Sequence, residues 1–281
     1  MQLTIQILLL ILVTAAVFLE GTAKGTLSAL TLWAVLGFSI AFATMMKATE
    51  GAGGRPNFLE AKRQLKLAIP MGLAGLAGTL LTQLDRVMVL SFCGEEAFAV
   101  YVVGAMELPV IGLVTGSMNA VLMPNFATLF EQGKLDEIRT LWKFAMGRAA
   151  LLLIPCMFGV FVFGVDLVES LYGETFREAY QPLAIYALML PMRCVVYGTM
   201  LLALGRSRHV TFSMFSALLM NCVLNYILIQ WLGSNGAAIA TVMSLYLSTM
   251  LMLPVIASEL QTPLRALFEW QFLGRILLWS A

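Results

Sequence analysis

Four ionisable residues lie inside stretches that are otherwise apolar enough to cross a membrane: Asp85, Arg86, Glu107 and Arg193. A charged side chain at membrane depth costs about 2.5–3.5 kcal/mol on insertion scales, so such residues mark substrate or ion pathways by default. Arginines attract anions, and carboxylates bind protons or metal cations. Because the four charges sum to zero, they argue mildly against a cavity built for organic cations.

The first two of these residues, Asp85 and Arg86, lie in the last third of a helix that we expect over Leu65–Phe92. Small and polar residues recur in it at steps of three and four, so they share one helical face. They are Gly72, Gly75, Thr79, Thr82 and Arg86. This stripe favours a helix that lines a cavity. The alternative is that Gly72 and Gly75 only allow a neighbouring helix to approach closely.

The other two charges lie beside prolines. Glu107 precedes Pro109 by two residues, and Arg193 follows Pro191 by two. A proline inside a helix frees the carbonyl four residues earlier, and open carbonyls beside a charge hold ions in the broken helices of transporters. These carbonyls belong to Ala105 and Ala187. An ordinary proline kink with satisfied charges is the equal alternative.

Polar stripes also mark three later helices. The clearest holds Asn221 and Asn225, one turn apart, and we predict that both contact substrate. The same stripe also includes His209, Ser213 and Ala217. The other two stripes are Thr241, Ser244 and Ser248 on the last predicted helix, and Glu107, Thr115 and Asn119 on the fourth. One stripe alone is usually contact between helices, but four stripes favour a shared, hydrated interior.

Composition restricts the class of protein. The chain has 281 residues, of which 60% are hydrophobic and 12% charged, against roughly 25% charged in soluble domains. A net charge of +1 offers no basic face for nucleic acid. One histidine and four scattered cysteines show no metal-ligand spacing, and we expect no metal or cofactor. An enzyme such as a polyprenyl-phosphate sugar transferase needs clustered carboxylates; the only adjacent acids lie in loops, so we expect no enzyme.

The fold class we predict is all-α, a polytopic helical bundle with eight transmembrane helices. Each predicted span is long enough to cross the hydrocarbon core, which needs about 20 apolar residues. They are Leu3–Leu19, Leu27–Met46, Leu67–Phe92, Phe98–Met123, Leu141–Phe163, Leu183–Leu204, Val210–Trp231 and Gly236–Ile256.

Loop charges set the orientation of these spans, because cytoplasmic loops carry an excess of lysine and arginine. Eight spans place nearly all loop cations on one side: Lys47, Arg55, Lys62, Arg63, Lys66, Lys134, Arg139, Lys143, Arg148, Arg206, Arg208, Arg265 and Arg275. Only Lys24 and Arg177 lie on the other side. We therefore predict that both termini are cytoplasmic.

The segment LAIPMGLAGLAGTLLTQLDRVMVLSFCG, followed by AFAVYVVGAMEL, resembles the second half of polysaccharide flippases in the multidrug/oligosaccharidyl-lipid/polysaccharide exporter superfamily. There a proline-led helix ends in Asp-Arg before a short turn and a Tyr-x-x-Ala-like helix. Here the alanine comes one place late, at Ala105. Further similar segments are MPNFATLF, LYGETFREA, LGR at 204–206 and GSNGAAIATVMS, so that the resemblance covers about Phe58 to Ile256.

The resemblance implies a transporter of two six-helix bundles around a central cavity. Residues 1–46 would be the last two helices of the first bundle, 47–66 a basic cytoplasmic linker and 67–257 the second bundle. Residues 258–281 would form an interfacial segment and the start of another helix. The chain would therefore be a fragment, or half of a dimer; its oligomeric state stays open.

The function that the resemblance implies is export of polyprenyl-diphosphate-linked oligosaccharide across the bacterial inner membrane by alternating access. Arg86 and Arg193 would attract the diphosphate. Asp85 and Glu107 would balance that charge or carry a coupling H⁺ or Na⁺, unless Glu107 pairs with Arg86 as a structural bridge. The alternative is a multidrug cation antiporter of the same superfamily, for which the eighteen methionines would provide an adaptable site. A purely structural membrane protein is a third reading.

Overall fold

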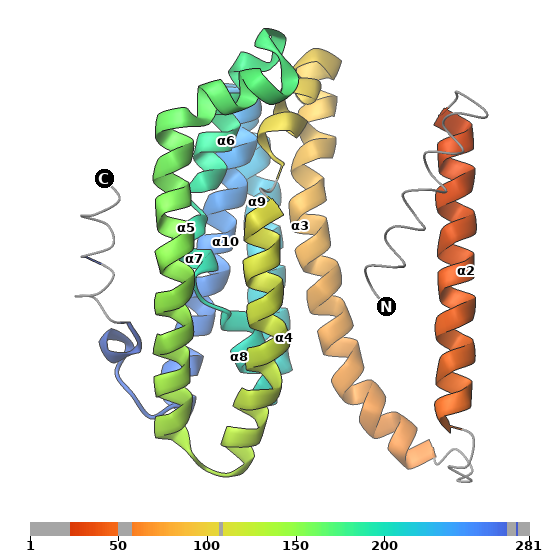
Figure 1. The fold of residues 1–281 in the computed structure, drawn as a ribbon, viewed down its shortest axis with the longest axis vertical. Coiled ribbons are helices and arrows are strands. Elements are labelled where there is room, and N and C mark those ends of the chain that lie inside the picture. Colours follow the sequence, from red (N-terminus) through yellow and green to blue (C-terminus); the bar gives the residue numbers. More distant parts are fainter. Residues whose placement is uncertain (1–22, 50–57, 107–108, 269–273, 275–281) are drawn as a thin grey trace. The chain divides into compact units, whose positions relative to one another are not determined.

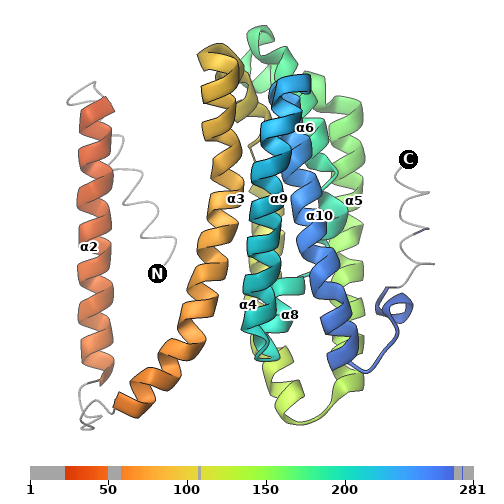
Figure 2. The same ribbon diagram turned by 180° about the vertical axis from the view of Figure 1, so that it is seen from behind.

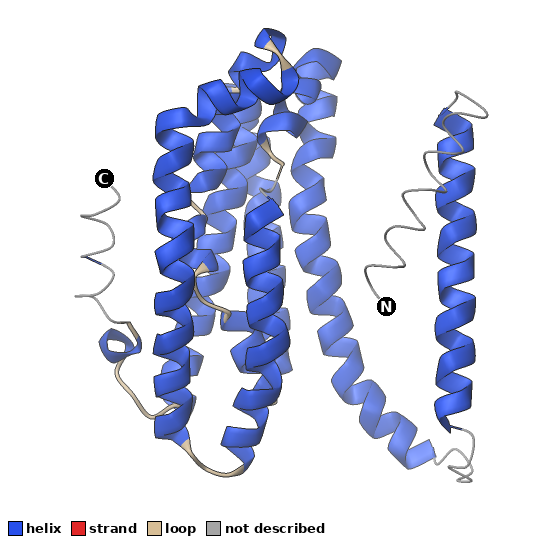
Figure 3. Cartoon of the chain, viewed as in Figure 1, coloured by secondary structure: helices blue, strands red, loops and turns tan. Residues whose placement is uncertain are grey.

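The computed structural model describes residues 23–49, 58–106, 109–268 and 274, and its elements there are helices (Figures 1 and 3). The predicted all-α class is thus confirmed. The chain divides into two compact units, 1–62 and 63–281. This boundary falls inside the predicted linker, but the predicted domain limits themselves stay predictions. All contacts discussed below lie within the second unit.

Among the described elements, a group of short helices separates the first long helices from the last two. The long helices are α2 (Ala23–Thr49), α3 (Phe58–Gly104), α4 (Pro109–Glu131), α5 (Leu135–Tyr172), α9 (Ser207–Leu232) and α10 (Ser234–Glu259). The short ones are η1 (Glu174–Ala179), α6 (Tyr180–Ala187), α7 (Leu190–Arg193), α8 (Tyr197–Ala203) and η2 (Leu264–Leu267).

Five of the described helices are long and apolar enough to cross a membrane, and the bent pair Glu174–Ala187 and Leu190–Ala203 makes a sixth if it counts as one span. By helix composition this is a multi-pass membrane protein. The predicted span Leu3–Leu19 lies outside the described residues. Leu27–Met46 lies within α2, where the stretch Thr31–Thr44 is found as a shorter apolar helix among the described residues.

The predicted end of a span at Phe92 agrees with the break of α3 at Gly94, but the next predicted span is wrong. The sequence predicted a second span over Phe98–Met123, but α3 resumes after a break at Gly94 and ends at Gly104, and α4 begins at Pro109. Gly94 has φ 86°, a left-handed conformation that glycine adopts without a Cβ clash. Pro109 does not interrupt a helix because the first position of a helix has no preceding turn to clash with its ring.

The predicted span Leu183–Leu204 lies in a broken segment, which divides into α6, α7 and α8. The two halves are bent by 47°. Pro191 lies in the first turn of α7, so proline again begins a helix. At the break between α6 and α7 the Tyr246 hydroxyl of α10 donates to the Leu188 carbonyl at 2.8 Å. This bond satisfies a carbonyl that has no partner within the helix because it lies at the helix end.

Helices α9 and α10 form an antiparallel hairpin and lie side by side in both views (Figures 1 and 2). They agree with the predicted spans Val210–Trp231 and Gly236–Ile256. Gly233 makes the turn with φ 59°. Gly236 lies so close to α9 that an added Cβ would stand 2.2 Å from the Leu228 carbonyl oxygen. The close approach of the two helices therefore requires glycine at 236.

The main apolar core lies between α5, the short helices α6–α8 and α10. Two side chains of α5 hold the end of α10 and the segment after it. Arg139 Nε donates to the Leu260 carbonyl at 3.0 Å, and Trp142 Nε1 donates to the Leu267 carbonyl at 3.1 Å. A cation at a helix C-terminus also favours the helix dipole. These contacts fix the chain as far as η2.

Candidate functional site

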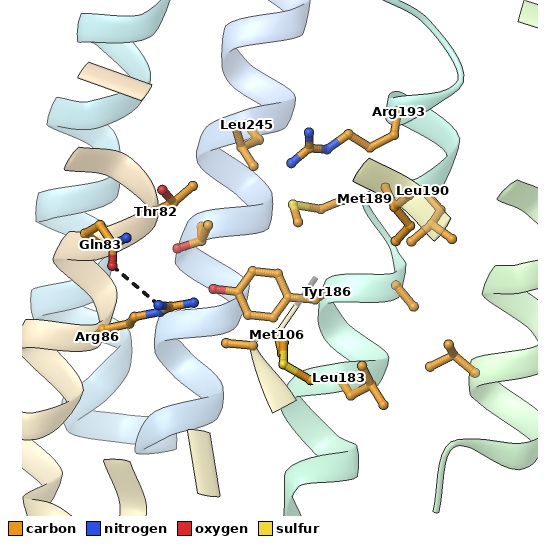
Figure 4. Close-up of a pocket in the computed structure, with 15 residues that line it drawn as sticks. Thr82, Gln83, Arg86, Met106, Leu183, Tyr186, Met189, Leu190, Arg193 and Leu245 are labelled. Carbon is orange, nitrogen blue, oxygen red and sulfur yellow. Dashed lines mark hydrogen bonds between the residues drawn. The ribbon is translucent and has the colours of Figure 1, made fainter. Parts of the chain in front are cut away.

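A cavity of about 220 Å³ lies among α3, α6, α7 and α10, next to the breaks described above (Figure 4). Its lining mixes apolar side chains with a few polar ones. The polar members are Thr82, Gln83, Arg86, Tyr186, Arg193 and Thr241. A mostly apolar pocket with few convergent polar groups is the usual form of a ligand site.

Two of the four predicted membrane charges meet at this cavity. Arg86 points from α3 toward Tyr186, and its Nη1 lies 3.5 Å from Gln83 Oε1. Arg193, the last residue of α7, points toward Leu245 of α10 (Figure 4). Both arginines are half-buried. The structure thus brings Arg86 and Arg193, 107 positions apart in the sequence, to one interior space.

Asp85 lies on the other side of α3 and is 1% exposed. Its Oδ2 accepts from three hydroxyl groups, at 2.6 Å from Tyr186, 2.8 Å from Tyr101 and 3.2 Å from Thr241. Its Oδ1 accepts from the backbone N–H of Arg86 at 2.6 Å. An ionised carboxylate only accepts hydrogen bonds, so four donors satisfy it. Through these bonds Asp85 joins both parts of α3, α6 and α10.

The two predicted asparagines belong to the Asp85 cluster and do not line the cavity. Asn221 Nδ2 donates to Thr241 Oγ1 at 3.0 Å, and Asn225 Nδ2 donates to Asn221 Oδ1 at 3.0 Å. Both side chains are fully buried. A chain of hydrogen bonds thus runs from Asn225 through Asn221 and Thr241 to Asp85. Contact of these asparagines with substrate stays a prediction.

The fourth predicted charge, Glu107, lies outside the described residues, so its pairing with Arg86 stays a prediction too. The two residues whose carbonyls we expected near the prolines, Ala105 and Ala187, both line the cavity. Ala105 directly follows the end of α3 and Ala187 is the last residue of α6, so each lies at a helix end rather than inside a kinked helix. That their carbonyls hold an ion stays a prediction.

The small-residue stripe on α3 is exposed at its glycines. An added Cβ at Gly72 or Gly75 would meet nothing within 4 Å among the described residues. The opposite stripe, which includes Ala74, Ala77 and Leu81, is buried. Further along the open stripe, Thr82 and Arg86 reach the cavity.

Sequence reasoning missed Tyr101 and Tyr186, the two tyrosines that bind Asp85. Their hydroxyl oxygens also lie 2.8 Å from each other. A buried tyrosine normally finds a hydrogen-bond partner, so a tyrosine within an apolar stretch was the available signal. Its partner could not be named from spacing, because Tyr186 lies 101 residues from Asp85.

Residues 2–181 match the model of a family described as "Polysaccharide biosynthesis protein". The chain belongs to this family. The resemblance to flippases of the multidrug/oligosaccharidyl-lipid/polysaccharide exporter superfamily is thereby confirmed. The match includes α3, α4 and α5 and ends at the start of α6.

The curated relatives of this polysaccharide biosynthesis family member share only a low sequence identity with it. The chain is 23% identical over 199 residues to the probable low-salt glycan biosynthesis flippase Agl15 of Haloferax volcanii, covering 70% of this chain and 42% of that protein. It is 24% identical over 197 residues to the capsular polysaccharide biosynthesis protein CapF of Staphylococcus aureus, covering 68% and 49%. It is 27% identical over 219 residues to the probable multidrug resistance protein NorM of Neisseria meningitidis serogroup B, covering 73% and 47%. The chain spans about half the length of the curated relatives it matches.

Proposed function

We propose that this protein takes part in moving a polyprenyl-diphosphate-linked oligosaccharide across the bacterial inner membrane by alternating access. The observation that carries the proposal is the meeting of Arg86 and Arg193 at one interior cavity. Two cationic groups that converge from different helices suit an anion with several oxygens, because arginine binds phosphate through parallel hydrogen bonds. Family membership supports the same class of substrate.

The topology we propose has eight transmembrane helices with both termini in the cytoplasm. Helices α3–α10 provide six of these spans when the broken segment counts as one. The loops at 132–134 and 204–206 lie at one end of these helices (Figure 1), and the strong excess of cations beside them supports a cytoplasmic location for that end. Residues 1–46 would supply the other two spans, and residues 67–257 would form a second bundle.

We assign the coupling of transport to Asp85, through H⁺ or Na⁺. The hydroxyls of Tyr186, Tyr101 and Thr241 donate to this carboxylate. A cation bound at Asp85 would replace these hydrogens, and the hydroxyl oxygens would then turn lone pairs toward it, because hard cations prefer oxygen ligands. Close by, Asn225 Oδ1 is buried and has no hydrogen-bond partner among the described residues. Tyr186 and Thr241 both line the cavity and bind Asp85. Binding of the ion at Asp85 and binding of the substrate in the cavity would therefore affect each other. Glu107 remains the second candidate for this role.

A multidrug cation antiporter is the second candidate function, because one relative carries that name. Its cavity would favour acids and aromatic rings. The described lining holds one aromatic ring, Tyr186, together with two arginines, which repel an organic cation. The geometry therefore favours an anionic substrate.

Transport in proteoliposomes tests the proposal. The protein is reconstituted with lipid-linked oligosaccharide extracted from the host membrane, and arrival of the glycan at the opposite leaflet is measured with a membrane-impermeant glycosidase. We expect transport by the wild-type protein and its loss in Arg86→Ala. Arg148→Ala is the matched control, because Arg148 lies exposed on α5 with its guanidinium carbon 4.9 Å from the Phe144 ring centroid. Intact transport by Arg86→Ala would overturn the role of Arg86, and efflux of ethidium in place of the lipid would favour the antiporter.

A further inference from the structure

A second cavity, of about 290 Å³, adjoins the arginine cavity. It lies between α4, the break that separates α7 from α8, and α10. The two cavities share three lining residues, Met189, Arg193 and Leu245. Arg193 therefore borders both spaces, and a ligand that extends past it reaches from one cavity into the other.

The second cavity differs from the first in charge, because it lacks Arg86 and, of the charged residues, shares only Arg193 with it. Its polar lining is rich in hydroxyl and amide groups. These belong to Thr115, Asn119, Tyr197, Thr199, Ser248 and Thr249. Arg193 is its single charged member among the described residues. The rest of the lining is apolar and includes Met192, Met214 and Met252. Hydroxyl and amide groups beside apolar side chains suit a sugar ring, which carries hydroxyls around an apolar ring face, better than a second phosphate.

The hydrogen bonds already made in this cavity define what it still offers. Thr115 donates to the Ile111 carbonyl at 2.9 Å, and Ser248 donates to the Leu245 carbonyl at 2.8 Å. A hydroxyl has one donor and two acceptor positions, so these groups can accept a hydrogen bond from a ligand hydroxyl. The Asn119 carbonyl oxygen accepts from Thr199, while its amide nitrogen carries two donor hydrogens.

We propose that this second cavity binds the sugar next to the diphosphate of the lipid-linked substrate, while the arginine cavity binds the diphosphate. This inference rests on the proposed function. The first sugar is bonded directly to the diphosphate, so its site must adjoin the anion site, and the shared wall at Arg193 provides that connection. A volume of about 290 Å³ lies just below the usual range of ligand pockets, about 300–1,000 Å³, which fits one sugar rather than a long glycan.

Asn119 is the residue on which to test the sugar site, because it is exposed and its change to alanine disturbs no core. The affinity of the full chain in nanodiscs is measured for two probes: lipid-linked oligosaccharide extracted from the host membrane, and undecaprenyl diphosphate without sugar. For Asn119→Ala we expect a loss of about threefold to tenfold with the first probe, the usual range for one hydrogen bond. We expect no change with the second probe. Thr199→Val, which removes one hydroxyl, should give the same pattern.

Asn125→Ala is the matched control. Asn125 lies on the same helix but does not line this cavity, and its side chain donates to the Val121 carbonyl at a distance of 2.7 Å. It should leave both affinities unchanged. Equal losses for both probes in Asn119→Ala and Thr199→Val, or no loss in either variant, would overturn the sugar site. Failure of the proposed function looks different, because the wild-type protein would then bind neither probe.

Discussion

The hydroxyl of Tyr186 lies 2.6 Å from Asp85 Oδ2, while the same tyrosine lines the cavity that holds Arg86. One side chain thus connects the buried carboxylate with the space proposed for the substrate. Asp85 and Arg86 are neighbours in the chain, yet the carboxylate group lies among hydroxyls and the guanidinium group reaches the cavity.

Tyr186→Phe should destabilise the protein. The change keeps the ring and removes a hydrogen bond to a charged group, which is worth about 1.5–3 kcal/mol. Thermal unfolding in detergent should show a lower midpoint temperature than for the wild-type protein. Tyr226→Phe is the control, because Tyr226 is 57% exposed. Equal midpoints for Tyr186→Phe and the wild type would show that the bond contributes nothing.

Asp85→Asn should uncouple transport from the ion gradient. The variant keeps the shape of the side chain and removes the charge that would hold H⁺ or Na⁺. We expect flipping in proteoliposomes to become insensitive to an imposed gradient of either ion, with undecaprenyl diphosphate still bound. Glu96→Gln, at an exposed position of α3, should respond as the wild type does. A gradient response preserved in Asp85→Asn would exclude Asp85 as the coupling group.

The exchange of charges between Arg86 and Glu107 separates binding from structural pairing. If Arg86 binds the substrate, Arg86→Glu combined with Glu107→Arg should stay as inactive as Arg86→Glu alone. If the two residues form only a structural bridge, the double variant should regain transport because the pair is restored. The flipping assay described above decides between these outcomes, and we expect no recovery.

Gly236→Ala should weaken the contact between α9 and α10. A Cβ at this position would stand 2.2 Å from the Leu228 carbonyl oxygen, and overpacking typically costs about 1–3 kcal/mol. Thermal unfolding should therefore start at a lower temperature. Gly159→Ala on α5 is the control, because nothing described lies within 4 Å of its added Cβ. A variant Gly236→Ala that unfolds like the control would refute the close approach.

The sequence was sufficient to predict the helices whose apolar length is uninterrupted. Helices α9 and α10 follow their predicted spans closely, and α5 contains its predicted span within a longer helix. It failed where a proline stands near a helix start. A proline within a helix and one in its first turn look alike in sequence, so we expected Pro109 and Pro191 inside helices, although each lies in the first turn of a helix.

The candidate site was only partly accessible from sequence. The cost of burying charge identified Asp85, Arg86 and Arg193 as notable residues, because that cost needs no knowledge of neighbours. Which group each one faces depends on residues far along the chain. Tyr101 and Tyr186, which lie 16 and 101 positions from Asp85, converge on it only because α3 breaks at Gly94 and α6 packs beside α10.

The central claim is that the cavity with Arg86 and Arg193 binds a diphosphate anion. The most direct test is the affinity of the purified protein for undecaprenyl diphosphate, with ethidium as the competing cation. We expect binding that ethidium does not displace and that weakens about tenfold or more in Arg86→Ala, since a charge-assisted bond is worth about 1.5–3 kcal/mol. Binding of ethidium that tightens in Arg86→Ala, with no binding of the diphosphate lipid, would contradict the claim.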